Sequence, residues 1–240
     1  MQAALAVGDH LLELQEPEGR LVGGWVHRFP YKHTYHLPPP WLSGMAQGQG
    51  ASLLVRLYSA TGDERYAEAA IRALEPMRHS TLDGGVAGDL GGGFFPQEYP
   101  TNPPAHVLNG GIFALWGCYD AALALGDDLG RQLAAEGIAT LAESLPRWDT
   151  GYWSRYDLFP HPLAHLATPM YHRLHTDQLR AMALIDTNPE FSRTAERFDG
   201  YARSRVNVGH AFARKVLFRL AVPRNRWLAF RTPWTRRSGR

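Results

Sequence analysis

Aromatic and polar side chains that could bind a sugar gather in four short clusters of the sequence. The clusters are Trp41–Gly50 (WLSGMAQGQG), Gln97–Pro100 with Val107–Gly110 (QEYP and VLNG), Arg147–Leu158 (RWDTGYWSRYDL) and Tyr171–Leu179 (YHRLHTDQL). Sugar rings stack their C–H faces on Trp and Tyr, whereas their hydroxyl groups need fixed donors and acceptors such as carboxylates and amides. Because buried Trp and Tyr also find polar partners in ordinary cores, composition leaves both a carbohydrate site and a set of satisfied buried aromatics open.

Other residues of catalytic or metal-binding type are few. His172 and His175 share one helical face at i, i+3, and His161 and His165 lie nearby in the sequence. No Cys or carboxylate at the spacing of a metal site accompanies them. The single cysteine, Cys118, lies in an apolar stretch, which predicts a buried, inert thiol and excludes an intrachain disulfide framework. The sequence therefore predicts neither a metal nor another cofactor.

The helices that would position these clusters are predicted from the 3.6-residue period of the apolar residues. Three pairs are expected, each with a more apolar helix followed by a more charged one: 42–60 with 63–78, 106–125 with 128–145, and 172–186 with 190–203. A last helix is expected over 208–220. The pairs predict an all-α fold in which helical hairpins surround a central cleft.

Three long loops rich in Gly, Pro, Tyr and Trp lie before and between the hairpins, over 17–41, 79–105 and 146–171. Loops longer than about 12–15 residues in a compact domain are usually functional. Short strands are expected only near Trp25–Phe29 and Gly92–Phe95. The loops and the starts of the inner helices are therefore the expected place of the site.

The length of the chain, 240 residues, fits one large domain or at most two small ones. No stretch approaches the roughly 18 uninterrupted apolar residues of a membrane span. Residues 1–15 lack the basic start of a signal peptide and carry Asp9 and Glu13. As written, the sequence is expected to be cytoplasmic, or to be a piece of a longer protein.

Charge is distributed unevenly along the chain. Lys and Arg number 25 and Asp and Glu 23, which gives a net charge of +2. Residues 203–240 hold 11 of the basic residues and no acidic ones, so residues 1–202 carry a net charge of −9. The basic C-terminal part predicts contact with an anionic partner such as a polyanionic chain, nucleic acid or a membrane surface.

Seven short segments, in order and with matching spacing, resemble the C-terminal domain of the D-glucuronyl C5-epimerases. They are Gly23–Trp25 (GGW), Trp41–Gln49 (WLSGMAQGQ), Glu98–Thr101 (EYPT), Val107–Gly110 (VLNG), Asp149–Gly151 (DTG), Tyr156–Leu158 (YDL) and Tyr171-His172-x-x-His175. Enzymes of this family convert glucuronic to iduronic acid within heparosan-type chains. The resemblance implies an (α/α) toroid-like domain over residues 1–205, followed by a basic C-terminal helix and tail over 206–240.

The resemblance also implies the site residues. A glutamate and three tyrosines are expected to be catalytic: Glu98, Tyr99, Tyr156 and Tyr171. The expected substrate contacts are Trp41, Gln47, Gln49, Asn109, Arg155, His172 and His175.

Two departures from the family pattern bear on the site. Vertebrate members carry an Arg shortly after the Tyr-Asp-Leu motif, suited to the substrate carboxylate, where this chain has Phe159 followed by Pro160. Arg155 or Arg173 is expected to take that role. Larger members also have β-rich domains ahead of the helical one, so the chain is expected to be a minimal member or a fragment.

The implied reaction makes definite chemical demands. Epimerisation at C5 removes a proton α to a carboxylate and returns one to the opposite face of the ring, which requires two acid–base groups and groups that offset charge on the carboxylate. Tyr156 beside Arg155 and Tyr171 beside His172 are the predicted acid–base pair, with Glu98 as a further base or a positioning group. Two other functions stay open: a polysaccharide lyase, which shares the proton abstraction at C5, and a non-catalytic glycan-binding module.

An anionic polysaccharide containing glucuronic acid is the expected partner, and no nucleic acid is expected. Local Arg and Tyr groups must recognise it, because the negative charge of residues 1–202 repels a polyuronate at long range. The basic tail would hold the polymer by non-specific attraction that salt weakens. Contact of the tail with a membrane surface, aided by Trp227, Phe230 and Trp234, and homodimerisation both stay open.

Overall fold

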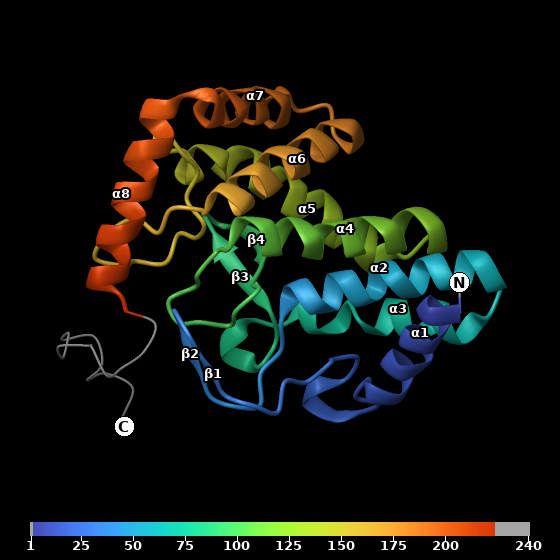
Figure 1. Cartoon of the computed structure of the whole chain (residues 1–240). Helices are drawn as coiled ribbons and strands as arrows, with labels where there is room; N and C mark the ends of the chain where they lie inside the picture. The colour runs from blue at the N-terminus through green and yellow to red at the C-terminus, as the bar shows by residue number, and fades with distance from the viewer. Residues whose placement is uncertain (1, 224–240) are drawn as a thin grey trace.

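Helices dominate the structure, and the strands are confined to two small hairpins (Figure 1). The computed structural model describes residues 2–223. In chain order these residues form α1 (Gln2–Leu14), β1 (Tyr31–Lys32), β2 (His36–Leu37), α2 (Gly44–Thr61), α3 (Glu64–Arg72), β3 (Ala87–Leu90), β4 (Gly93–Pro96), α4 (Leu108–Leu125), α5 (Asp128–Ser144), α6 (Pro169–Ile185), α7 (Pro189–Arg203) and α8 (Arg205–Ala221). The predicted all-α class is confirmed.

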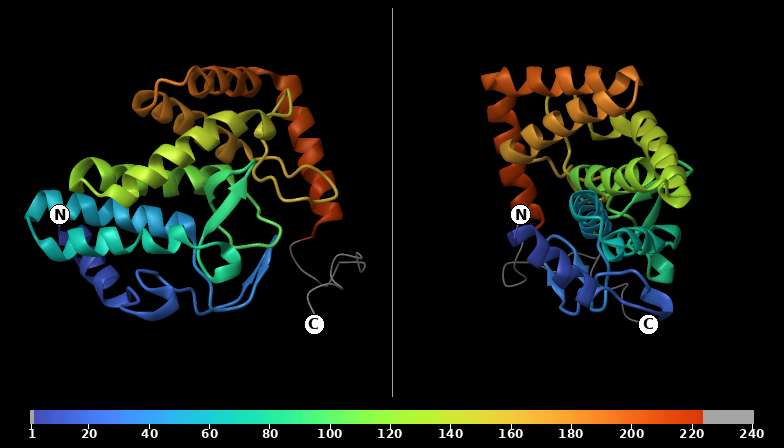
Figure 2. Two further views of the ribbon diagram at one scale, coloured as in Figure 1. Left: turned by 180° about the vertical axis from the view of Figure 1, so that it is seen from behind. Right: turned by 90° about the vertical axis from the view of Figure 1, so that its right-hand side faces the viewer.

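The helices pair as the apolar period predicts. α2 packs against α3, α4 against α5, and α6 against α7. The first helices of these pairs also follow one another in space, because α4 contacts both α2 and α6 (Figures 1 and 2). Closure of this row into a toroid stays a prediction.

α4 is the core helix of the array. Among the described residues it is the one helix that is long and apolar enough by composition to cross a membrane. Here α2, α5 and α6 pack around it. A Cβ atom on Gly48 of α2 would overlap the backbone of Ala114, and one on Gly117 of α4 would overlap the backbone of Gly48. Glycine is therefore required where the backbones of α2 and α4 meet.

Some predicted boundaries move for local reasons. α3 ends at Arg72, well before residue 78, and Glu75–Arg78 form a 3₁₀ turn, since Pro76 has no N–H with which to continue an α-helix. The expected strand near Gly92–Phe95 is confirmed as β4. The strand expected over Trp25–Phe29 is reduced to a single bridge between His27 and Trp41, because the N–H of Trp25 donates to Oε1 of Gln47 at 2.9 Å instead.

The β3–β4 hairpin carries two catalytic candidates towards α4. Its two-residue turn, Gly91 and Gly92, has φ values of +70° and +92°, which suit glycine in a tight hairpin. β4 contacts α4 and α5. The next residue, Gln97, accepts a hydrogen bond from the N–H of Gly44 at 2.8 Å, at the start of α2. Residues 98 and 99 are thereby held beside the starts of α2 and α4.

α8 runs from the end of α7 along one side of the molecule towards β1 and β2 (Figures 1 and 2). Its buried residues are Ala211 and Phe218. Ala211 packs with Trp153 and Leu166 of the loop that precedes α6. The predicted boundary at 205/206 falls at the start of this helix.

Candidate active site

A pocket with a volume of about 270 Å³ lies where the β1–β2 hairpin, the loop before α6, the first turn of α6 and α8 meet. Its lining residues are Tyr31, His33, Thr34, Tyr35, Tyr99, Tyr156, His165, Thr168, Tyr171, Lys215 and Arg219. Five of the ten tyrosines of the chain are in this set. It is called the tyrosine pocket below.

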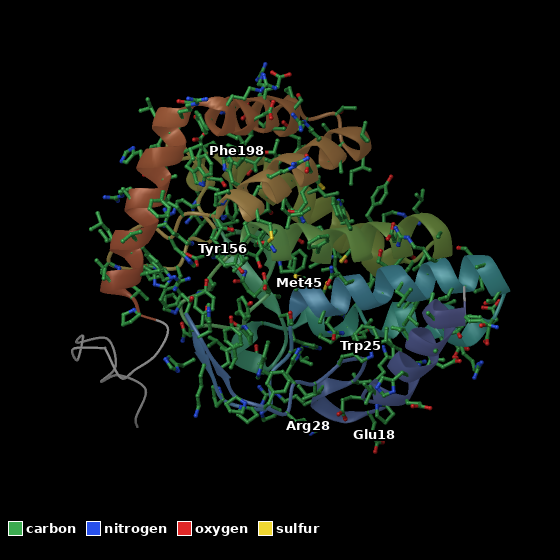
Figure 3. All side chains as sticks on the ribbon, in the orientation of Figure 1. Glu18, Trp25, Arg28, Met45, Tyr156 and Phe198 are labelled. Carbon is green, nitrogen blue, oxygen red and sulfur yellow. The ribbon has the colours of Figure 1, made fainter. Side chains whose placement is uncertain are left out.

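Backbone hydrogen bonds fix the positions of the two central tyrosines. The carbonyl of Tyr156 accepts from the N–H of Leu108 at 3.2 Å, and its N–H donates to the carbonyl of His165 at 2.7 Å. This loop residue is thus attached to the start of α4. Tyr171 lies in the first turn of α6, where its N–H donates to Oγ1 of Thr168 at 3.3 Å. Figure 3 shows Tyr156 on the side of the molecule along which α8 runs.

The tyrosine rings form two groups in contact. The rings of Tyr156 and Tyr171 meet edge to face with centroids 5.0 Å apart. Tyr99 stacks on Tyr31 with centroids 4.9 Å apart and lies 5.0 Å from Tyr35. Burial, followed by the negative charge of Glu98, raises the pKa of Tyr99 and of Tyr156 far above the ordinary value. These phenols are therefore protonated near neutral pH and can donate protons.

Glu98 lies behind the tyrosines with only 5% of its surface exposed. Its Oε2 has no hydrogen-bond partner among the described residues and lies against Gly110, in the first turn of α4, where a Cβ atom would overlap it. Burial raises the pKa of Glu98 to about 7, although a hydrogen bond from Tyr99 lowers it in part. Among the four predicted catalytic residues, this is the group suited to accept a proton near neutral pH.

Two cations from α8 reach the same pocket, Lys215 and Arg219. Nη1 of Arg219 donates to Oγ1 of Thr34 at 3.3 Å, and Nη2 lies 3.4 Å from Nε2 of His165. Nζ of Lys215 donates to the carbonyl of Leu166. The family motifs did not indicate these two cations, because α8 follows the part of the sequence that resembles the epimerases. Their i, i+4 spacing puts them on one helix face, but only the fold shows where that face points.

Asp157 joins several of these side chains. Its Oδ2 accepts from the Tyr35 hydroxyl and from Nδ1 of His165, the latter at 2.6 Å, and lies 3.6 Å from Nε2 of His161. Burial raises the pKa of Asp157, but the two histidines outweigh that effect and bring it to about 2. Burial lowers the pKa of His165 to about 4. Near neutral pH, Asp157 is therefore an anion and His165 a neutral donor at Nδ1.

Asp157, His161 and His165 are also the group among the described residues that could hold a metal ion. Each offers one ligand atom, and the three atoms lie within 4.8 Å of one another. Two of these atoms, Nδ1 of His165 and Oδ2 of Asp157, already form a hydrogen bond with each other. The adjacent cations, Lys215 and Arg219, oppose a further positive charge. The arrangement is better suited to hydrogen bonding than to coordination.

Three expected substrate contacts, Trp41, Gln47 and Gln49, lie outside the lining of the tyrosine pocket. Gln47 is fully buried, and its Nε2 donates to the carbonyls of Gly23 and Ala73 at 3.0 and 2.9 Å. Trp41 stacks on the His27 ring with centroids 4.1 Å apart, and Gln49 is exposed on α2. Gln47 therefore links the first turn of α2 to the loop at Gly23 and to the C-terminal end of α3.

His172 and His175 are buried side chains of α6 and do not line the pocket. Oγ of Ser154 lies 2.8 Å from Nδ1 of His172 and 2.9 Å from Nδ1 of His175. Nε2 of His172 donates to the carbonyl of Phe198 at 2.9 Å. The two histidines therefore connect the loop before α6 with α6 and α7. Any effect of theirs on a bound substrate would be indirect.

Asn109 and Arg155, the remaining expected contacts, lie near the pocket without lining it. Asn109, in the first turn of α4, is 3% exposed, and its Oδ1 has no hydrogen-bond partner among the described residues. Burial lowers the pKa of Arg155. Its Nε atom has no hydrogen-bond partner among residues 2–223. Tyr31 and Tyr35 also line the pocket and were not among the predicted site residues. The signal in the sequence was an aromatic pair four residues apart in a predicted loop.

Comparison with known proteins identifies a family and two relatives of this chain. Residues 19–200 match the family described as "D-glucuronyl C5-epimerase C-terminus". Over 218 residues the chain is 35% identical to the D-glucuronyl C5-epimerase of Caenorhabditis elegans, an alignment that covers 83% of this chain and 35% of that protein. It is 31% identical over 160 residues to an uncharacterised protein of Methanocaldococcus jannaschii, which covers 65% of this chain and 50% of that protein.

The chain thus spans about a third of the nematode relative and half of the archaeal one. The matched residues 19–200 include the four predicted catalytic residues, from Glu98 to Tyr171. They end before α8, which begins at Arg205. On the extent of these matches, the chain belongs to the D-glucuronyl C5-epimerase family.

Proposed function

We propose that this chain epimerises C5 of D-glucuronic acid residues within a heparosan-like polysaccharide and that the tyrosine pocket is its active site. One observation carries the proposal. Tyr99, Tyr156 and Tyr171 come from three separate segments and converge on one pocket, and the charge of buried Glu98 acts on the pKa of all three. Lys215 and Arg219 supply positive charge to the same pocket.

The shifted pKa values indicate which groups act as acid and which as base. Ionised Glu98 does not line the pocket, so it takes up the proton through Tyr99, which lines the pocket and donates a hydrogen bond to it. The Tyr99 hydroxyl passes its proton to Glu98 as its oxygen takes the C5 proton, and the electron pair of the C–H bond moves into the carboxylate of the sugar. A protonated tyrosine, Tyr156 or Tyr171, then donates a proton to C5 from the opposite face, and the electron pair returns to carbon. The sugar is neither oxidised nor reduced, and one proton has been exchanged with solvent through the enzyme. If the proton held by the base first exchanges with solvent, its return to the original face restores glucuronate with an exchanged C5 hydrogen.

The test follows iduronate formation and exchange of the C5 hydrogen in deuterated water by NMR, on desulfated, N-deacetylated or N-sulfated heparosan. The variant that lacks the donor, Tyr156→Phe or Tyr171→Phe, should form no iduronate while polymer binding is largely retained. Tyr58→Phe, on α2, is the control and should form iduronate like the wild type. Full conversion to iduronate in both pocket variants would reject the assignment. Formation of an unsaturated uronate, seen by its absorbance, would identify a lyase instead.

A further inference from the structure

The tyrosine pocket has positive charge on one wall. Lys215 and Arg219 of α8 both line it, and no Asp or Glu is among its lining residues. The phenols of Tyr99, Tyr156 and Tyr171 also line the pocket, and burial keeps them protonated. A ligand that enters this pocket therefore meets two cations and several hydroxyl donors, which is an environment for an anionic oxygen group.

Arg219 is held in place by a chain of contacts that ends at Asp157. Its Nη2 donates to Nε2 of His165 at 3.4 Å, and its guanidinium lies 5.2 Å from the centroid of the Phe218 ring. His165 stacks on Phe218 with centroids 4.2 Å apart and donates through Nδ1 to Asp157 at 2.6 Å. Because His165 is neutral, with a pKa lowered by burial, its Nε2 keeps the lone pair that accepts from Arg219.

The cations predicted from the sequence lie elsewhere. Arg173 has 86% of its side chain exposed, with its Nε 3.8 Å from Asp177 on the outside of α6. Arg155 does not line the pocket. Phe159 packs in the apolar cluster with Tyr35, their ring centroids 5.6 Å apart. Of the cations in the described part of the chain, Lys215 and Arg219 are the ones that line the pocket.

We propose that Lys215 and Arg219 bind the carboxylate of the sugar that is deprotonated, and that His165 and Asp157 position Arg219. The identity of the sugar rests on the proposed function. A guanidinium can bind both carboxylate oxygens at once, with the ammonium as a second charge. When the C5–H bond breaks, the electron pair moves onto these oxygens, so the two cations stabilise the intermediate more than the ground state.

The experiment compares binding of a heparosan oligosaccharide with binding of the same oligosaccharide after reduction of its carboxyl groups to alcohols. The wild type should prefer the carboxylate form. Arg219→Gln and Lys215→Gln should each lose about tenfold or more in affinity for that form, with little change for the reduced form. Arg214→Gln, which removes an equal charge from α8 without lining the pocket, should keep the preference. An unchanged preference in both pocket variants would overturn the inference.

A second pair of variants tests positioning. His165→Gln can still donate to Asp157 and accept from Arg219, whereas His165→Leu can do neither. The Leu variant should lose the preference for the carboxylate form and the Gln variant should regain most of it. Equal preference in the two variants, with both folded by circular dichroism, would contradict the positioning role.

Failure of this inference and failure of the proposed function give different results. If the protein prefers the carboxylate form through Arg219 but never exchanges the C5 hydrogen, the anion site is supported and the epimerase proposal is contradicted. If Arg219→Gln and Lys215→Gln exchange the C5 hydrogen as efficiently as the wild type, the epimerase proposal is supported and the carboxylate-binding role of the two cations is contradicted.

Discussion

Glu98 is a carboxyl group whose ionisation the fold opposes. Burial raises its pKa from 4.5 to about 7, so between these two values the folded protein binds more protons than the unfolded chain. The contribution of Glu98 to the free energy of unfolding is therefore present below 4.5 and is lost as the pH rises through 7. A buried carboxyl group with a strongly shifted pKa, which destabilises the folded state when it ionises, is typical of active sites.

Replacement of Glu98 by Gln should remove this dependence. The variant should gain stability relative to the wild type as the pH rises from below 4.5 to above 7, by about 3 kcal/mol across the window. Urea unfolding of both proteins at the two ends of the window measures the difference. A constant difference at all pH values would mean that Glu98 does not titrate between them.

The same titration predicts the pH dependence of the reaction. If Glu98 accepts the C5 proton, exchange should increase as the pH rises through about 7, since only the ionised carboxylate is a base. Initial rates of deuterium incorporation over this range test it. Glu98→Gln should show no such rise, because an amide cannot take up the proton. A wild-type rate that is flat through this range would assign the base to another group.

The backbones of α2 and α4 approach each other closely where Gly48 meets Ala114 and Gly117. A side chain at position 48 would meet the backbone of Ala114, and backbone cannot move aside as a flexible side chain can. Gly48→Ala should therefore lower the free energy of unfolding by about 1–3 kcal/mol. Gly200→Ala in α7, where nothing lies within 4 Å of the new methyl group, should raise it by up to about 1 kcal/mol. Urea denaturation of the two variants gives the comparison, and equal effects would show that the crossing tolerates a wider spacing.

Helices and hairpins were predictable because their apolar period is local, and the catalytic candidates were predictable because short motifs resemble a family. The contacts made by individual polar residues were not predictable from the sequence. Gln47 could equally face a ligand or satisfy the carbonyls of Gly23 and Ala73, and the structure gives it the second role. Sequence alone does not distinguish these, because both require an amide at a helix start.

The pocket wall was unpredictable for a different reason. Tyr35 and Asp157 are 122 residues apart, yet their side chains are hydrogen-bonded. Arg219 and Thr34 are 185 residues apart and also in contact. Such pairings depend on how α8 and the β1–β2 hairpin pack on the helical array, and no local pattern encodes that.

Across the whole molecule, the basic C-terminal part divides into two. Five of its 11 Lys and Arg residues lie within 203–219 and include the two that line the tyrosine pocket. The other six lie within 224–240, outside the described residues, as do Trp227, Phe230 and Trp234. The predicted attraction of the tail for an anionic polymer concerns the second group, whereas α8 belongs to the pocket.

Deletion of residues 224–240 should therefore separate polymer capture from catalysis. It leaves α8 complete, so exchange of the C5 hydrogen at saturating substrate should be retained. The affinity for long heparosan should decrease, and its dependence on salt should become shallower, because six positive charges no longer attract the polymer. Affinity for a short oligosaccharide that fills only the pocket should change little. Binding of both ligands over a series of salt concentrations is the measurement. If the deletion alters neither polymer affinity nor its salt dependence, the tail takes no part in capture, and the cations of α8 account for all the electrostatic recognition of the substrate.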